Sequence, residues 1–377
     1  MLLQQAAREA QARLQQRPRL RALAKRADLE VARARHGIAT VLPGAIRPSP
    51  RQITIAVTAH CNLRCQGCRY GRDFMPGSVL PLALVRDLLD DARQGGVATV
   101  RFYGGEPLLH PELPDMIRHA CRIGLRPYVT SNATHLGTRI DALYEAGLRL
   151  VTIGFYGTEA DYDAYTQRAG HFARLERSLE QVRRRYGRGE LELQLNFVLL
   201  RQSCTTDALH RAWEFARRFD MFLHVDLANY AAPFFVQGFD NDLQLRPEDR
   251  GSVETVALAM LALKRAEPER FLHSVEFIRS VPDWMLQGPA MRVRCDAYEL
   301  LWVGADGTVQ LCDVALPLGN VHQTRLRDIL FSRRHREAAL AAFRLDCPNC
   351  TCKAETRIVK DAAAMRRYGR RLPGEAG

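Results

Sequence analysis

The chain has 377 residues, of which 47% are hydrophobic and 25% charged, proportions that are ordinary for a soluble globular protein. This length allows two modules and a large buried core. No uninterrupted apolar run approaches the ~18 residues of a membrane span. The N-terminus also lacks the short apolar core of a signal peptide, so we expect a cytoplasmic protein without a transmembrane segment.

The net charge of +12 belongs mainly to the two ends of the chain. Residues 1–36 carry nine Lys and Arg against three acids, and residues 353–377 carry seven against three. These basic stretches have no interleaved aromatic residues and no RNA-binding fingerprint, which argues against a nucleic-acid partner. A non-catalytic iron–sulfur or zinc protein that binds nucleic acid through its basic ends is nevertheless a second class of function.

The predicted elements begin with a basic helical extension over residues 1–48, with a break near Pro18. Strands and helices then alternate. The predicted strands cover 52–58, 97–103, 126–130, 149–155, 192–200 and 222–228, and the predicted helices 80–94, 111–123, 136–146, 171–186 and 205–219. Six such alternations predict an α/β fold with a parallel sheet that binds ligands at the carboxyl ends of its strands.

Three cysteines follow the first predicted strand with the spacing C-x3-C-x2-C: Cys61, Cys65 and Cys68. Three thiolates on one short loop can bind three irons of a 4Fe–4S cluster and leave the fourth iron without a protein ligand. An open coordination site of this kind indicates a reactive cluster. The alternative is a structural zinc site, to which His60 would add a fourth ligand.

A second motif, Gly104-Gly105-Glu106, follows the second predicted strand. Glycines let the backbone approach a ligand closely, and a glutamate can pair with an ammonium group. The two motifs, in this order, resemble the radical S-adenosylmethionine (radical SAM) superfamily over about residues 50–240. The resemblance implies a partial (β/α)6 TIM-like barrel over residues 49–240, a 4Fe–4S cluster on the three cysteines, and S-adenosyl-L-methionine held by Gly104, Gly105 and Glu106.

The resemblance extends to polar residues on the next strands. Ser131 and Asn132 follow the third strand, and Thr152 and Asn196 lie on the fourth and fifth. They are candidates for contacts to S-adenosyl-L-methionine, while a turn or ordinary interior packing is the alternative for each. One position departs from the family: Gly67 stands where an aromatic residue usually precedes the third cysteine, and Tyr70 and Phe74 are the nearest substitutes.

The C-terminal part is expected to form a helical bridge over 241–292, a small α+β cluster-binding domain over 293–355 and a basic tail over 356–377. Ala232–Phe235, just before this bridge, and Trp284 within it are candidate pocket residues. A hairpin with an Asp306-Gly307 turn is predicted between the first two cysteines of a set of five. These are Cys295, Cys312, Cys347, Cys350 and Cys352.

This pattern, with Gly319-Asn320 and a helix before the last three cysteines, resembles the auxiliary iron–sulfur domains called SPASM and, in shortened form, twitch. Five cysteines are too few for the two clusters of a full SPASM domain. We therefore expect the twitch form with one auxiliary 4Fe–4S cluster on Cys295, Cys312, Cys347 and Cys350, and a spare Cys352. A four-cysteine zinc ribbon is the alternative.

Together the resemblances imply a metal-binding oxidoreductase or maturase. Such an enzyme reductively cleaves S-adenosyl-L-methionine to a 5′-deoxyadenosyl radical that abstracts a substrate hydrogen atom, with an electron donor such as flavodoxin or ferredoxin. The segment before the first strand is short for a fused module that binds a leader peptide. We therefore favour oxidation of a small polar metabolite of the sugar or aminocyclitol type, with maturation of a ribosomally made peptide as the alternative. No catalytic side chain is assigned.

Overall fold

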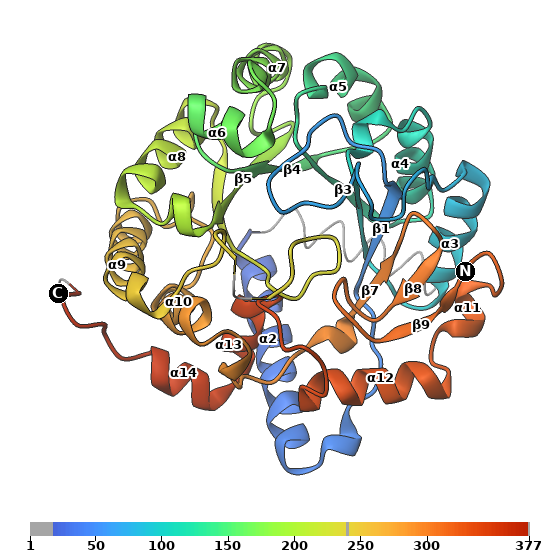
Figure 1. Ribbon diagram of the computed structural model, residues 1–377. Helices are drawn as coiled ribbons and strands as arrows, with labels where there is room; N and C mark the ends of the chain where they lie inside the picture. The colour runs from blue at the N-terminus through green and yellow to red at the C-terminus, as the bar shows by residue number, and fades with distance from the viewer. Residues whose placement is uncertain (1–17, 239–240, 376–377) are drawn as a thin grey trace.

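The computed structural model describes residues 18–238 and 241–375. Its centre is a curved sheet whose first six strands run parallel, in the order β6-β5-β4-β3-β2-β1 (Figure 1). The strands are β1 (Gln52–Thr58), β2 (Thr99–Gly104), β3 (Arg126–Ser131), β4 (Leu150–Phe155), β5 (Glu192–Leu199) and β6 (Phe222–Leu227). All six predicted strands are confirmed, with ends that differ by at most two residues.

Helices follow the strands and cover the outer face of the sheet (Figure 1). Strand residues alternate accordingly, as on β5, where Leu193, Leu195 and Phe197 are buried and the residues between them are partly exposed. The helices are α3 (Leu82–Gln94), α4 (Leu113–Arg122), α5 (Leu136–Glu145), α6 (Glu159–Thr166), α7 (His171–Arg185) and α8 (Thr206–Arg218). Short 3-10 helices are η1 (Pro43–Ala45), η2 (Pro107–Leu109), η3 (Arg201–Ser203), η4 (Pro247–Asp249), η5 (Gly288–Ala290) and η6 (Ala297–Glu299).

The predicted hairpin does not stand apart from the barrel strands. β7 (Leu300–Val303) pairs in parallel with β1, and β8 (Thr308–Gln310) and β9 (Pro317–Asn320) continue the sheet in antiparallel fashion. The sheet therefore has nine strands, and the sequence pattern had not indicated β9. This pairing fixes the C-terminal cysteines relative to the barrel.

The described part of the predicted basic tail, residues 356–375, is largely helical. α9 (Arg250–Ala266) and α10 (Val275–Gln287) form the bridge, followed by α11 (Leu326–Ile329), α12 (Arg333–Arg344), α13 (Ala354–Lys360) and α14 (Ala362–Tyr368). Arg357 and Lys360 are buried, and Lys360 Nζ lies 2.6 Å from Asp296 and 2.7 Å from Glu299. The charge of Lys360 is therefore neutralised inside the domain.

The N-terminal extension also packs on the C-terminal domain. α2 (Pro18–Val41) places the buried His36 ring edge-on to Phe343 at 5.0 Å, and Arg33 Nε donates to Val359 O at 2.7 Å. Proline is tolerated in a first helical turn, so Pro18 suits the start of α2. The predicted break before it lies outside the described residues. No helix of the described residues has the length and apolar character that crossing a bilayer requires.

Candidate active site

The cysteine loop after β1 is held in place by backbone hydrogen bonds to a neighbouring helix. Gln66 N–H donates to Tyr165 O at 2.8 Å and Arg64 N–H to Thr166 O at 3.1 Å, both at the end of α6. Within the loop, Cys68 N–H donates to Cys65 O at 3.2 Å. The α6 helix, which the sequence pattern did not predict, thus fixes the loop at the carboxyl end of β1.

The three thiols of this loop are close enough for their charges to interact. Burial raises the pKa of Cys61 to about 12 and raises the pKa values of Cys65 and Cys68 as well. The neighbouring thiols Cys61 and Cys68 add to the effect at Cys65. Free thiols here would stay protonated, so a metal that binds them must release their protons. Three convergent thiols without a disulfide fit an iron–sulfur cluster.

The space beside Gly67, where a side chain would lie, is filled by an aromatic ring from another segment of the chain. A Cβ atom at Gly67 would lie 2.7 Å from Phe235, and the backbone there has a φ of +75°. Phe235 comes from the irregular segment after β6 and forms an isolated bridge with Cys68. Tyr70 and Phe74 instead pack edge to face at 5.0 Å in a separate aromatic cluster. Of these rings, Phe235 is the one that contacts Gly67.

The two glycines after β2 are required by the loop that follows β1. A Cβ atom at Gly104 would lie 2.3 Å from Thr58 O, and one at Gly105 would lie 2.2 Å from His60 O. Gly105 N–H and Glu106 N–H donate to these same two carbonyls at 2.8 and 2.7 Å. Glycine is therefore needed to bring the second motif against the residue before Cys61.

Glu106 is fully buried and joins the ends of β2 and β3. Its Oε1 accepts hydrogen bonds from Leu108 N–H at 2.9 Å and Ser131 Oγ at 2.7 Å, and its Oε2 accepts from Asn132 N–H at 2.8 Å. Burial raises the pKa of Glu106 to about 7, against these hydrogen bonds, which lower it. An ionised carboxylate has about four acceptor positions, so Oε2 can accept a further donor such as an ammonium group.

Asn62 connects the cysteine loop to the same end of β3. Asn132 Nδ2 donates to Asn62 Oδ1 at 2.9 Å, and Asn62 Nδ2 donates to Thr134 Oγ1 at 3.0 Å. The structure thus brings Ser131 and Asn132 together with both motifs. Sequence reasoning missed Asn62, because nothing in the local pattern shows its partner seventy residues away.

The other predicted contacts lie on the inner face of the sheet, which is opposite to the face that the helices cover. The strand register aligns Thr130 with Thr152 and Asn196 with His224 along this face. Thr152 Oγ1 lies 2.6 Å from Thr130 Oγ1, and Asn196 Nδ2 donates to Asp226 Oδ2 at 2.9 Å. The inner face is thus polar.

The five C-terminal cysteines form a second group. Burial raises the pKa of Cys295 to about 12 and raises that of Cys347, and Cys350 interacts electrostatically with both. Burial raises the pKa of Cys312, and the charges of Cys350 and Cys295 raise it further. The thiol of Cys352 forms a side-chain hydrogen bond with Cys350. It also accepts a hydrogen bond from Asn229 Nδ2 at 2.9 Å and lies 3.4 Å from Asp313 Oδ1.

A buried cation holds the last cysteine loop in place. Arg357 donates to Cys350 O at 2.7 Å, to Asn349 Oδ1 at 2.8 Å and to Val293 O at 3.0 Å, and it stacks over the fully buried Trp284. Trp284 is therefore a core residue rather than part of a pocket.

The comparisons with known proteins agree with both cysteine groups. The family model of the radical SAM superfamily matches residues 55–200, and that of an iron–sulfur cluster-binding domain, SPASM, matches residues 295–353. The chain belongs to the radical SAM superfamily and carries a C-terminal SPASM-type domain. This membership implies a 4Fe–4S cluster, S-adenosyl-L-methionine and auxiliary iron–sulfur binding.

Curated relatives match less than half of this chain. GTP 3',8-cyclase of Chlorobaculum tepidum is 31% identical over 173 residues, which cover 45% of this chain and 51% of that protein. The same enzyme of Listeria welshimeri is 33% identical over 157 residues, 40% of this chain and 45% of that protein. The chain thus spans about half the length of the curated relatives it matches.

Solved structures match the fold over more of the chain. The structure of anSMEcpe with bound AdoMet has a TM-score of 0.60 at 16% identity, covering 78% of this chain and 84% of that one. Streptococcus suis SuiB bound to precursor peptide SuiA has a TM-score of 0.58 at 13% identity, covering 87% and 77%. At these identities the likeness concerns the fold.

Proposed function

We propose that this radical SAM protein reductively cleaves S-adenosyl-L-methionine at Cys61, Cys65 and Cys68 and uses the resulting radical to oxidise a substrate on the inner face of the sheet. The observation that carries the proposal is that hydrogen bonds join the cysteine loop, Glu106, Ser131 and Asn132 at the carboxyl ends of β1, β2 and β3. Thr152 on the inner face pairs with Thr130, the residue before Ser131.

The protein's own part in this reaction is to bind, orient and exclude water. Cys61, Cys65 and Cys68 would hold the radical cluster, which supplies an electron to S-adenosyl-L-methionine when bound. Glu106 would accept a hydrogen bond from the ammonium group of S-adenosyl-L-methionine, beside Gly104 and Gly105. Ser131 and Asn132 hold the Glu106 carboxylate in place through their hydrogen bonds to it. Thr152 and Asn196 would meet its ribose from the inner face.

The C-terminal group would hold one auxiliary 4Fe–4S cluster through Cys295, Cys312, Cys347 and Cys350. Cys352, which interacts with Cys350 through a side-chain hydrogen bond, is assigned as the spare thiol on the family pattern. We also propose that an electron donor such as flavodoxin or ferredoxin reduces the protein. All ten cysteines are free, and free thiols persist in the cytoplasm, so we propose a cytoplasmic location.

The polar inner face favours a small polar substrate of the sugar or aminocyclitol type. Peptide maturation is the second candidate, favoured by the fold likeness to SuiB, which was solved with a precursor peptide. The relatives called GTP 3',8-cyclase match less than half of this chain, so a nucleotide is not preferred.

The proposal predicts that the anaerobically purified, reduced protein forms 5′-deoxyadenosine from S-adenosyl-L-methionine, and that replacing Cys61, Cys65 and Cys68 together by Ala abolishes it. Chromatography with mass spectrometry measures the product, and fractions of polar metabolites and of peptides are screened for a loss of two mass units. Cys121→Ala, outside both groups, is the control and should keep the activity. Deoxyadenosine from the triple variant would contradict the proposal.

A further inference from the structure

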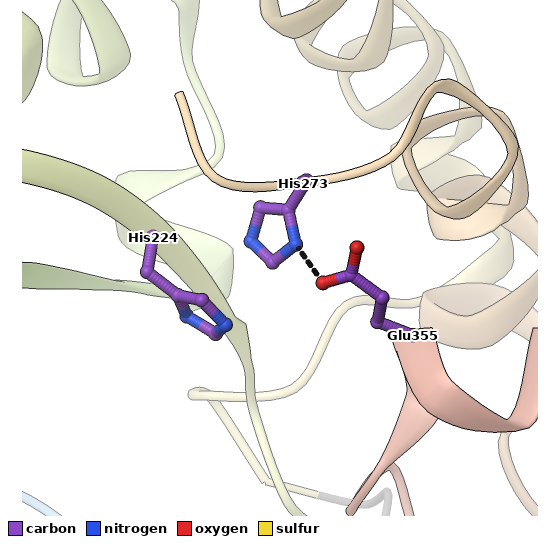
Figure 2. Close-up of side chains that lie close together, drawn as sticks. All are labelled: His224, His273 and Glu355. Carbon is purple, nitrogen blue, oxygen red and sulfur yellow. Dashed lines mark hydrogen bonds and ion pairs between the residues drawn. The ribbon is translucent and has the colours of Figure 1, made fainter. Parts of the chain in front are cut away.

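Two histidines and two carboxylates gather where the inner face meets the C-terminal domain. His224 and Asp226 lie on β6, His273 precedes α10, and Glu355 lies in the first turn of α13. Ligand atoms of His224, His273 and Glu355 all lie within 4.8 Å of one another. Figure 2 shows His273 between the other two, with Glu355 on the side away from His224.

The hydrogen bonds of His273 fix the position of its proton. Its Nε2 lies 2.8 Å from Val225 N–H and must therefore accept, so in the neutral ring the proton sits on Nδ1. Nδ1 lies 2.7 Å from Glu355 Oε2 and donates to it, while Glu355 Oε1 accepts from Ser274 N–H at 2.8 Å. Burial lowers the pKa of His273, so the ring stays neutral and both of its nitrogens are used.

This arrangement argues against a metal ion at the cluster. A metal on Nδ1 of a neutral imidazole requires the proton on Nε2. That proton would point at the Val225 N–H, so two donors would face each other. The His273–Glu355 pair is thus a positioning pair rather than a set of ligands.

His224 has a different environment. Its Nδ1 is buried and faces Asp226 Oδ1 at 3.3 Å, whereas Nε2 is neither buried nor bonded to a described residue. The ring centroid lies 4.2 Å from that of His273. The side chains of His224 and Asp226 keep 27% and 44% of their surface on the inner face, while His273 keeps 1%. His224 is therefore the histidine of the cluster that a substrate can reach.

We infer that His224 is the general base of the inner face and takes the proton that the substrate loses when it is oxidised, with Asp226, His273 and Glu355 as positioning residues. The inference rests on the proposed function. After hydrogen-atom abstraction, an alcohol substrate is a carbon radical that still carries its O–H group. It becomes a carbonyl when the O–H bond breaks and the proton goes to His224 Nε2. The oxidised auxiliary cluster that Cys295, Cys312, Cys347 and Cys350 would hold would accept the one electron.

The charges around His224 suit this role. Burial lowers its pKa, but the negative charges of Asp226 and Glu355 outweigh burial and raise the pKa above its usual value, against an opposing effect of Arg101. His273 is neutral and adds no charge beside His224. A base whose pKa lies near the working pH is the most effective one.

The first test needs no substrate. Diethyl pyrocarbonate reacts with neutral, accessible imidazole, and peptide mass spectrometry assigns the label. In the anaerobic full-length protein, His224 should be labelled and His273 should not. Asp226→Asn should move the labelling midpoint of His224 to lower pH by about one unit or more, because an anionic neighbour is removed. An unlabelled His224, or an unchanged midpoint in Asp226→Asn, would overturn the inference.

The second test uses whichever metabolite fraction yields an oxidised product. His224→Gln should lower the ratio of oxidised product to deoxyadenosine by ~100-fold, and added imidazole should restore part of it. Glu355→Gln should move the acid limb of the pH profile and the labelling midpoint of His224 together. Full product from His224→Gln, or bound zinc that His224→Gln removes, would overturn the inference. If the wild-type protein forms no deoxyadenosine, the proposed function is contradicted. The environment inferred for His224 is then decided by the labelling test, which needs no substrate.

Discussion

At the scale of single residues, Glu106 is the side chain on which the two sequence motifs depend most. It is a fully buried acid whose hydrogen bonds come from Leu108, Ser131 and Asn132. Its folded-state pKa of about 7 lies above the ordinary 4.5, because burial outweighs those bonds. The ionised form is therefore disfavoured in the folded protein, and the resulting loss of stability grows from about pH 4.5 to pH 7 and is complete above it.

We expect Glu106→Gln to remove this pH dependence. The variant loses the hydrogen bond from Asn132 N–H, so its free energy of unfolding should be lower than that of the wild-type protein at pH 5. This difference in free energy, the gap, should shrink by up to about 3 kcal/mol by pH 8, because only the wild-type protein loses stability as Glu106 ionises. Thermal unfolding of both proteins between pH 5 and 8, at equal iron content, measures the gap. The exposed Glu337→Gln change is the control, and a gap that stays constant with pH would show that Glu106 titrates normally.

At the scale of elements, the close contact between the ends of β1 and β2 positions the cysteine loop. The backbone of Gly105 approaches His60 O so closely that even one methyl group does not fit. Because the obstructing atoms belong to the backbone, relief requires a shift of the loop that carries Cys61. The glycines of this motif therefore have a structural task in addition to any contact with a ligand.

Gly105→Ala should destabilise the protein by about 3 kcal/mol or more, because overpacking against backbone cannot be relieved by a rotamer change. Gly251→Ala, in α9 with nothing within 4 Å of the added carbon, should change stability by less than about 1 kcal/mol. Unfolding temperatures of the two variants provide the comparison. Equal stabilities would mean that the loops after β1 and β2 can move apart without a loss of stability.

At the scale of the whole molecule, the two cysteine groups are parts of one structure. β7 pairs with β1, and Thr351 Oγ1 donates to Ala228 O at 3.2 Å, which ties the last cysteine loop to the end of β6. The helices α2 and α13 are joined by the hydrogen bond from Arg33 to Val359 O. The described parts of the two basic ends, residues 18–36 and 353–375, therefore pack with the C-terminal domain.

Iron content should reflect two clusters. The intact protein should hold about eight irons, and the Cys61/Cys65/Cys68 triple Ala variant about four, since each cubane has four. Adding Cys347→Ala and Cys350→Ala should remove most of the rest, while Cys352→Ala in the intact protein should change little. Metal analysis of purified proteins decides the matter: about four irons and one zinc would indicate a zinc ribbon, and about twelve irons a second auxiliary cluster.

The sequence by itself determined the features that depend on local spacing. The alternation of apolar residues located all six parallel strands, and the spacings around Cys61 and Gly104 identified the superfamily, because these signals lie within a few residues of one another. The five C-terminal cysteines were recognisable for the same reason, and the family match over residues 295–353 agrees with them.

Only the tertiary structure decided which distant groups meet. The ring of Phe235 against Gly67, the tie between Asn62 and Asn132, the burial of Arg357 in a stretch that composition assigned to a tail, and the His224–His273–Glu355 cluster all join residues far apart in the chain. Nothing in the sequence near His224 distinguishes it from an ordinary strand residue. Its environment arises because β6, the segment before α10 and α13 pack together, and such long-range packing leaves no periodic trace in the sequence.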